Sequence, residues 1–353
     1  MDDSRKCAPK CLPERAPNSN DVDRSPGQAW KLVSNAIGEF PQASVAVGCS
    51  GGPDSAALAI VARDVCLAMG RRLSLLHVHH GLQADADAWA RSVRELGRLL
   101  DVPVSEQRIS VDLSLGDGVE GAARRARYSA LTHMMQTTES DVLLLAHHRQ
   151  DQAETVLFRL FRGAGVHGLQ AMQSQSERNG MLILRPWLEL DRHDVLAIVD
   201  SFSAQHAWTP VQDPTNTDLA YARGVLRSKL IPEIAQHWPQ WASSLSRHAR
   251  QAAEAGALLD EVADEWLSAL DPGATDASFS LKPWRDLPPT RQHHVLRRWL
   301  AKQGCRMPSE ARLAELVRQL QTVHAMGHDR DLTWEHDGRI VSCERGRVIC
   351  RRV

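Results

Sequence analysis

The stretch VAVGCSGGPDSAALA, residues Val45 to Ala59, decides the fold of this chain. It opens as a short apolar run, breaks at Ser50-Gly51-Gly52, and resumes from Pro53 as an Ala- and Leu-rich segment. Proline suits the first turn of a helix because the N–H that it lacks has no partner there. The stretch therefore predicts a strand over 44–50, a glycine turn, and a helix from Pro53 to Met69.

The chemistry of this turn favours an anion. Two successive glycines let the backbone approach a phosphate and expose N–H groups, and the following helix adds the positive end of its dipole. Ser50 and Ser55 supply hydroxyl donors, whereas Asp54 repels phosphate unless a cation such as Mg²⁺ lies between them. The structural alternative is a tight turn between a buried strand and a buried helix. A strand before the turn and a helix after it favour phosphate binding, and no Gly-Lys-Ser/Thr of a Walker A loop follows.

The rest of the first half alternates in the same way. Strands are predicted over 73–81, 102–110, 141–148 and 181–190, and helices over 84–101, 119–136, from Asp151 onward, and over 191–206 with Asp191 as the cap. This alternation predicts an α/β fold, a Rossmann-like parallel sheet with helices on both faces. Such sheets bind ligands at the carboxyl ends of their strands. Polar residues follow three of these ends, namely 50–55, His79-His80-Gly81, and His147-His148 leading to Asp151.

Length and composition set the outer limits. A chain of 353 residues suggests about two domains, and 43% hydrophobic with 24% charged residues is typical of a soluble protein. We expect a disordered polar leader over 1–27, a first domain over 28–235, and a smaller, mainly helical domain over 240–353. The second domain ends in a predicted β-hairpin turning at Asp337-Gly338.

Charge and cysteines limit the class of protein further. The net charge of −1 does not indicate nucleic-acid binding, which would then depend on a local basic face. Seven scattered cysteines contain no CxxC pair, so we expect free thiols in a reducing compartment, the cytoplasm. No apolar run is long enough for a membrane span, and no membrane partner is expected.

The turn sequence SGGPDS resembles the PP-loop of the N-type ATP pyrophosphatases, which split ATP into AMP and pyrophosphate. Four further segments resemble the tRNA(Ile)-lysidine synthase family, and the resemblance spans Val45 to Pro232. These segments are HVHHGLQADADAWA (77–90), EGAARRARY (120–128), LAHHRQDQAETVLFRLFRGAGVHGLQAM (145–172) and DPTNTDLAYARGVLR (213–227). Two positions depart from the family pattern. Gln150 stands where the family usually has the first Asp of an acidic pair, and Gly224 stands where Asn usually follows the Arg.

The resemblance implies an adenine nucleotide alpha hydrolase-like fold and a two-step reaction. ATP adenylates the C2 oxygen of the wobble cytidine in an isoleucine tRNA with a CAU anticodon, and the ε-amine of free L-lysine then displaces AMP. The resemblance also implies that 28–235 is the PP-loop catalytic domain and that 240–353 binds tRNA or substrate. The implied cofactors are ATP and Mg²⁺. The implied catalytic residues are Asp54, Asp151 and Arg223, with Asp54 and Asp151 as metal ligands. The implied nucleotide-binding residues are Ser50, Gly51, Gly52, Pro53, Asp54, Ser55, His80, Gly81 and His148.

Other interpretations stay open from the sequence alone. Another PP-loop enzyme, such as a tRNA 2-thiolase, would need cysteine pairs that this chain lacks. A non-catalytic nucleotide- or RNA-binding protein would not need Asp54, Asp151 and Arg223. The base that deprotonates lysine is not identified, with Glu154 and His148 as candidates, and a homodimer is compatible with the sequence. Two arginine-containing clusters are either solvated faces or RNA contacts: Arg124 and Arg127 beside Tyr128, and Arg297, Arg298 and Lys302.

Overall fold

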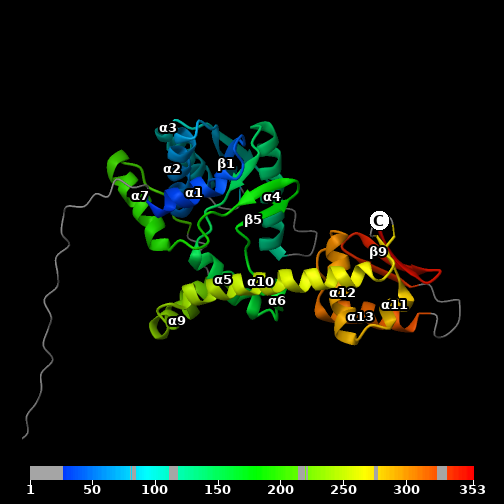
Figure 1. Cartoon of the computed structure of the whole chain (residues 1–353). Helices are drawn as coiled ribbons and strands as arrows, with labels where there is room; N and C mark the ends of the chain where they lie inside the picture. The colour runs from blue at the N-terminus through cyan, green and yellow to red at the C-terminus, as the bar shows by residue number, and fades with distance from the viewer. Residues whose placement is uncertain are drawn as a thin grey trace, which may run out of the picture.

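The computed structural model describes residues 27–79, 81, 85–110, 118–213, 219, 222–273, 277–323 and 332–353, and only the backbone at 118–120. The described chain folds into two bodies joined by a long helix (Figure 1). The predicted leader, apart from Gly27, and His80 lie outside the described residues.

The first body is built on a mostly parallel sheet, as predicted. Within the described residues, six strands run in the order β3-β2-β1-β4-β6-β5. All neighbours pair in parallel except β5 and β6, which are antiparallel. β5 was not predicted, because its polar, largely exposed residues carry no apolar pattern. The strands are β1 (Val45–Gly48), β2 (Leu73–His79), β3 (Val104–Arg108), β4 (Val142–Leu144), β5 (Gln175–Arg178) and β6 (Met181–Leu184).

Helices cover both faces of this sheet, because buried apolar residues of its strands point alternately to the two sides. Val45 and Val47 of β1 pack with one set of helices, whereas Ala46 packs with Tyr128 and Leu131 on the other side. The first set comprises α1 (Gln28–Gly38), α2 (Pro53–Ala68), α3 (Ala86–Leu100) and α7 (Arg192–His206), and the other face is covered by α4 (Gly118–Thr137). The predicted sheet with two covered faces is thus confirmed.

The second body contains helices and a small antiparallel sheet. Its helices are α11 (Leu281–Arg285), α12 (Pro289–Lys302) and α13 (Glu310–Thr322). In the described part of the chain, its sheet has four strands in the order β7-β10-β9-β8: β7 (Ser278–Ser280), β8 (Thr333–His336), β9 (Arg339–Glu344) and β10 (Arg347–Arg352). The predicted turn at Asp337-Gly338 joins β8 to β9, with both residues at positive φ. Buried Trp284, Trp299 and Trp334 dominate the core.

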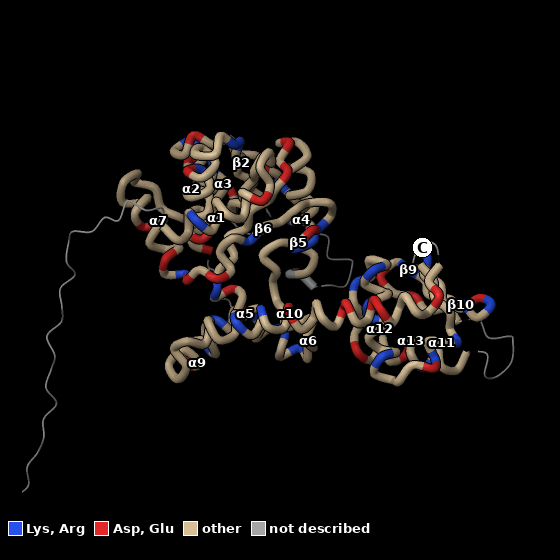
Figure 2. The backbone as a smooth tube through the Cα atoms, in the orientation of Figure 1, with Lys and Arg blue, Asp and Glu red and all other residues tan. Residues whose placement is uncertain are grey.

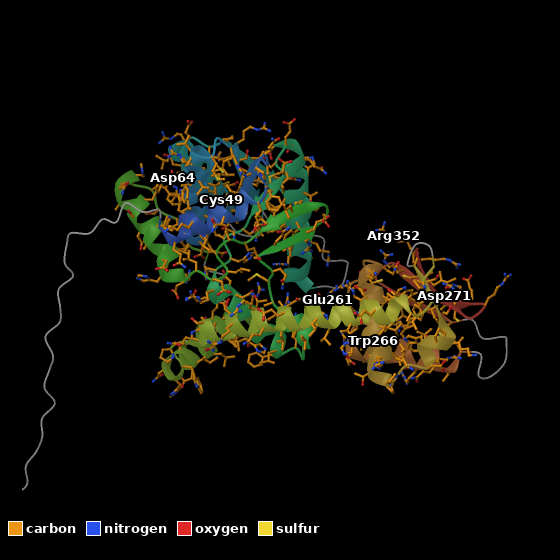
Figure 3. All side chains as sticks on the ribbon, viewed as in Figure 1. Cys49, Asp64, Glu261, Trp266, Asp271 and Arg352 are labelled. Atoms are coloured by element: carbon orange, nitrogen blue, oxygen red, sulfur yellow. The ribbon has the colours of Figure 1, made fainter. Side chains whose placement is uncertain are left out.

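The long helix α10 (Trp241–Ser268) belongs to both bodies. It packs against α5 (Arg149–Leu160) and α6 (Val166–Leu169) of the first body and against α12 of the second. Trp241 and Ala242 meet Ala153 and Leu157 of α5 in a buried apolar cluster. At the other end Trp266 packs against the second core, and Figure 3 labels it there. Three short segments precede α10: α8 (Ala222–Val225), the π-helical η2 (Leu226–Leu230) and α9 (Ile231–His237).

No described helix is both long and apolar enough to cross a membrane.

Candidate functional site

The glycine turn connects β1 to α2 at the carboxyl edge of the sheet. Gly51 has φ +87°, a conformation that residues with a side chain rarely adopt. A Cβ there would also lie 3.2 Å from the Cγ2 atoms of Val93 and Val211. The Ser55 hydroxyl donates to the Gly52 carbonyl (3.0 Å) and accepts the Ser50 N–H (3.2 Å), so Ser55 holds the turn closed from inside.

A segment distant in sequence packs against this turn, since Val211 lies 160 residues after Gly51. The Val211 N–H donates to the Gly51 carbonyl at 2.8 Å. Val211 lies just before the sequence segment 213–227 that was singled out for its family resemblance. This hydrogen bond therefore places Val211, two residues before that segment, against the glycine turn.

His148 organises the start of α5. Its Nδ1 accepts the Asp151 N–H at 3.4 Å, and its own backbone N–H donates to Asp151 Oδ2 at 3.1 Å. This reciprocal pair is a capping box, in which an N-cap residue and the third residue of the helix satisfy each other's N–H groups. The helix therefore begins at Arg149, and the prediction that it opens at Asp151 was wrong.

The same histidine joins the two predicted carboxylates. His148 Nε2 lies 3.6 Å from Asp54 Oδ1 and 3.3 Å from Asp151 Oδ2. Because Nδ1 accepts an amide proton, the proton of the neutral ring is on Nε2 and faces both carboxylates. The His148 side chain is buried, whereas those of Asp54 and Asp151 are 30% and 21% exposed. Asp54 and Asp151 thus come from different helices to one point.

This donor set suits Mg²⁺. Mg²⁺ prefers oxygen ligands and is usually held by one or two carboxylates together with substrate phosphates and water. Asp54 and Asp151 offer carboxylate oxygens that are partly open to solvent beside a turn suited to phosphate. Among the described residues, no group of three or more His, Cys, Asp or Glu side chains is placed to hold a metal ion.

Arg227 and Glu154 extend the site along α5. Arg227 Nε lies 2.9 and 2.8 Å from the two carboxylate oxygens of Glu154, and its terminal nitrogen lies 3.3 Å from Asp151 Oδ1. Burial raises the pKa of Glu154, and the charge of Arg227 opposes that shift. Sequence reasoning gave Arg227 no role, although it ends the segment 213–227 in which Arg223 was chosen.

Arg223 lies at the edge of this group. Its guanidinium is 5.6 Å from the centre of the Phe158 ring on α5, a cation–π distance. Its charge also lowers the pKa of Glu154, less than Arg227 does. The predicted catalytic arginine is therefore beside Glu154, while Arg227 makes the direct contacts to the carboxylates.

Three residues at the carboxyl end of β2 have different surroundings. Gly81, with φ +66°, is exposed just after β2. His77 Nδ1 lies 2.9 Å from the Cys49 carbonyl, and His79 Nε2 lies 3.1 Å from Asp87. Burial lowers the pKa of His77. His77 and His79 thus contact residues of the framework.

Arginines gather around Tyr128 on α4. The guanidinium groups of Arg178 and Arg124 lie 4.1 and 5.2 Å from the centre of its ring. Burial raises the pKa of Tyr128, but Arg124 and its neighbours outweigh this and lower it. The predicted proximity of Arg124 to Tyr128 is confirmed. The group makes this flank of the sheet strongly positive.

Family models match both bodies. A model described as "PP-loop domain" matches residues 27–234, and one described as "TilS substrate binding domain" matches residues 279–349. Fold, turn and carboxylate pair therefore define an ATP-using PP-loop protein that carries a separate substrate-binding domain. The chain belongs to the tRNA(Ile)-lysidine synthase family, whose members are ligases that form a carbon–nitrogen bond.

The relatives are similar over nearly the whole chain. The tRNA(Ile)-lysidine synthase of Bordetella parapertussis is 54% identical over 94% of this chain and 97% of its own length. That of Ralstonia nicotianae is 43% identical over 80% of this chain and 60% of its own length. Among solved structures, the U34-tRNA thiolase NcsA from Methanococcus maripaludis with its [4Fe-4S] cluster has a TM-score of 0.54. It is 15% identical over 64% of this chain and 78% of its own, a likeness of fold alone.

Proposed function

We propose that this enzyme joins free L-lysine to C2 of the wobble cytidine of the CAU-anticodon isoleucine tRNA, converting its codon specificity from AUG to AUA. The observation that carries the proposal is the convergence of Asp54 and Asp151 on His148 beside the glycine turn. ATP first transfers its adenylyl group to the C2 oxygen and releases pyrophosphate. The lysine ε-amine then attacks C2, and AMP leaves with that oxygen.

In the first step, the chain binds and orients the triphosphate. The Ser50–Ser55 turn and the N-terminus of α2 present backbone dipoles to the phosphates. Asp54 and Asp151 would hold Mg²⁺, which neutralises negative charge on the leaving pyrophosphate when bound. His148 fixes the two carboxylates through its Nε2–H. Arg223 supplies a nearby positive charge for the transition state.

In the second step, the ammonium of lysine must lose a proton before it can attack. We assign this role to Glu154, because burial raises its pKa and so makes it a better proton acceptor. His148 is less suited, since one ring nitrogen accepts an amide proton and the other faces two carboxylates. Arg227 keeps Glu154 in place through both oxygens.

Recognition of the tRNA is assigned to both bodies. The second body would hold the part of the tRNA remote from the wobble base, and the arginines around Tyr128 carry positive charge near the sheet edge. The cluster of Arg297, Arg298 and Lys302 is a weaker candidate than its sequence suggests. Each of these side chains is ion-paired, with Glu310, with Asp260 and Asp264, and with Asp264 respectively.

We also propose that the enzyme works in the cytoplasm, where tRNA, ATP and free lysine occur together. The described cysteines, Cys49, Cys66, Cys305, Cys343 and Cys350, are free thiols, which suits a reducing compartment.

The test uses Asp54→Asn, with Asp64→Asn as the matched control. Asp64 lies on the same helix with its side chain 53% exposed and paired with Arg63. The wild type and the control should release pyrophosphate and incorporate labelled lysine into the isoleucine tRNA but not the methionine tRNA. Asp54→Asn should lose at least about 100-fold in pyrophosphate release yet still bind tRNA. Unchanged turnover in Asp54→Asn, or labelling of the methionine tRNA, would overturn the proposal.

A further inference from the structure

The guanidinium of Arg192 lies beside the glycine turn. Arg192, the first residue of α7, has its Nε 3.5 Å from Asp54 Oδ1, and its side chain is 48% exposed. α7 packs along α2, so the first turn of α7 lies next to that of α2. Among the described residues, the terminal nitrogens of Arg192 contact no acceptor. They can therefore still donate to an incoming ligand.

Gln150 fixes the backbone that carries Arg192. Its Oε1 accepts the Arg192 N–H at 3.0 Å, and its Nε2 donates to Asp191 Oδ2 at 3.1 Å. Asp191 is itself the N-cap of α7, accepting the His193 N–H at 2.9 Å. Gln150 thus ties the start of α5, where Asp151 lies, to the start of α7.

The amide of Gln150 can make both contacts at this position, and a carboxylate cannot. Gln150 donates to one partner and accepts from the other, whereas a carboxylate has no proton to donate to Asp191. An Asp or Glu here would instead place a second negative charge against that of Asp191. The departure from the family pattern at Gln150 therefore has a structural purpose in this chain.

We infer that Arg192 binds the pyrophosphate portion of ATP and that Gln150 is the positioning residue for Arg192. The inference rests on the proposed function, since it requires ATP at the glycine turn. A guanidinium matches phosphate oxygens with a planar pair of donors, and charge-assisted hydrogen bonds of this kind are among the strongest in proteins. When ATP enters, Arg192 exchanges the Asp54 carboxylate for phosphate oxygens.

The competing explanation is that Arg192 is only a surface ion pair. Half-exposed pairs of this kind contribute little to folding. If Arg192 were only such a pair, its loss would have no reason to weaken ATP binding more than AMP binding, because the two nucleotides share the adenosine and the α-phosphate. Affinity for these two nucleotides therefore separates the explanations.

The first experiment titrates the full-length protein with ATP, inorganic pyrophosphate and AMP by calorimetry in the presence of Mg²⁺. Arg192→Ala should weaken ATP and pyrophosphate binding by about 10- to 100-fold and leave AMP binding unchanged. Arg192→Lys should recover part of the loss. The control is His193→Ala, the next residue, whose side chain is 89% exposed. Unchanged ATP affinity, or an equal loss for AMP, would overturn the inference.

The second experiment tests Gln150 through its two partners. Gln150→Glu should weaken ATP binding by about 3- to 10-fold, because it loses the donor to Asp191. Adding Asp191→Asn should restore part of the affinity, since Asn can donate to Glu and still cap α7, although it loses the ion pair with Arg149. In the Arg192→Ala background, Gln150→Glu should have no further effect. If Asp191→Asn does not restore ATP affinity, or if Gln150→Glu weakens ATP binding further in the Arg192→Ala background, Gln150 does not position Arg192.

Failure of the inference and failure of the proposed function give different results. If Asp54→Asn abolishes pyrophosphate release while Arg192→Ala still binds ATP normally, only the role of Arg192 is wrong. If Asp54→Asn turns over normally, the site itself has been misassigned, whatever Arg192 does.

Discussion

His147 and His148 are adjacent, yet the two rings have different surroundings. His148 shares its ring nitrogens with an amide and two carboxylates, whereas the buried Nδ1 of His147 has no partner among the described residues. Burial lowers the pKa of His147 to about 3, Asp151 opposes this shift, and Arg185 and Arg127 reinforce it. His147 is therefore neutral in the folded protein at any pH near neutrality.

This difference predicts an acid sensitivity of folding. The unfolded chain protonates His147 near the ordinary histidine pKa of 6.5, but in the folded chain the pKa is about 3. The unfolded state therefore binds more protons between these values, and the free energy of unfolding falls as the pH is lowered from 6.5 towards 3. His147→Gln should flatten this dependence in urea unfolding without nucleotide, while His133→Gln, at an exposed position of α4, should not. If the free energy of unfolding depends on pH in the same way for the wild type and His147→Gln, the prediction is wrong.

Glu154 offers a second prediction at the level of one residue. If its carboxylate accepts the lysine proton, Glu154→Gln should leave adenylation nearly intact and slow lysine transfer by about 100-fold or more. Adenylated tRNA should then accumulate, which can be followed by trapping the labelled AMP moiety on RNA. Asp54→Asn should show the opposite pattern, with little adenylate formed. Equal slowing of both steps in Glu154→Gln would argue for a structural role instead.

The sequence identified some of these residues and missed others for a physical reason. Asp54 and Asp151 lie within local patterns, a turn before a helix and the start of a helix, and the family resemblance of these patterns marked both residues. The roles of Gln150 and Arg227 depend on partners 41 and 73 residues away. One sequence holds no signal for such pairs, and Gln150 could be seen only as a departure from the family pattern.

Among the elements, long amphipathic or apolar segments were predicted well and short polar ones were not. α2 and α7 begin where proline and an aspartate cap predicted them. β5 is polar and sits at the sheet edge, so it lacks an alternating pattern. The start of α5 was misplaced because histidine is an uncommon cap, and its capping role depends on the reciprocal bond with Asp151.

The turn from α3 to β3 depends on a glycine inside a helix. A Cβ at Gly97 would lie 2.3 Å from Val104 Cγ2 and 2.9 Å from the Val102 carbonyl oxygen. Gly97→Ala should therefore destabilise the protein by about 1–3 kcal/mol, despite a gain of about 1 kcal/mol in helix propensity. Gly256→Ala in α10 is the matched control, since its Cβ would meet His167 at 3.6 Å, an ordinary contact. It should be neutral or stabilising in urea unfolding, and a stabilised Gly97→Ala would refute the close approach.

At the scale of the whole molecule, α10 connects the catalytic body to the substrate-binding body. Its acidic positions lie between its middle and the end nearest α12, as Figure 2 shows. Asp260 is shared between the bodies: one oxygen lies 3.0 Å from His167 Nε2 on α6, and the other lies 3.0 Å from a terminal nitrogen of Arg298 on α12. Arg298 also binds Asp264 of α10 through two nitrogens. Asp260 therefore contacts both bodies, and these contacts help to fix their relative orientation.

A tRNA that contacts both bodies requires this orientation, so Asp260→Asn should raise the KM for tRNA by about 3- to 10-fold. The affinity of the Asp260→Asn variant for ATP should not change, because Asp260 contacts α6 and α12 and not the glycine turn. Asp264→Asn is the control, since it loses contacts to Arg298 and Lys302 but none to His167. An anticodon stem-loop too short to reach the second body should be modified equally well by the wild type and Asp260→Asn. If Asp260→Asn modifies the stem-loop as poorly as it modifies full-length tRNA, Asp260 acts on the catalytic body alone. The contacts of α10 with the two bodies then do not determine how tRNA binds across both.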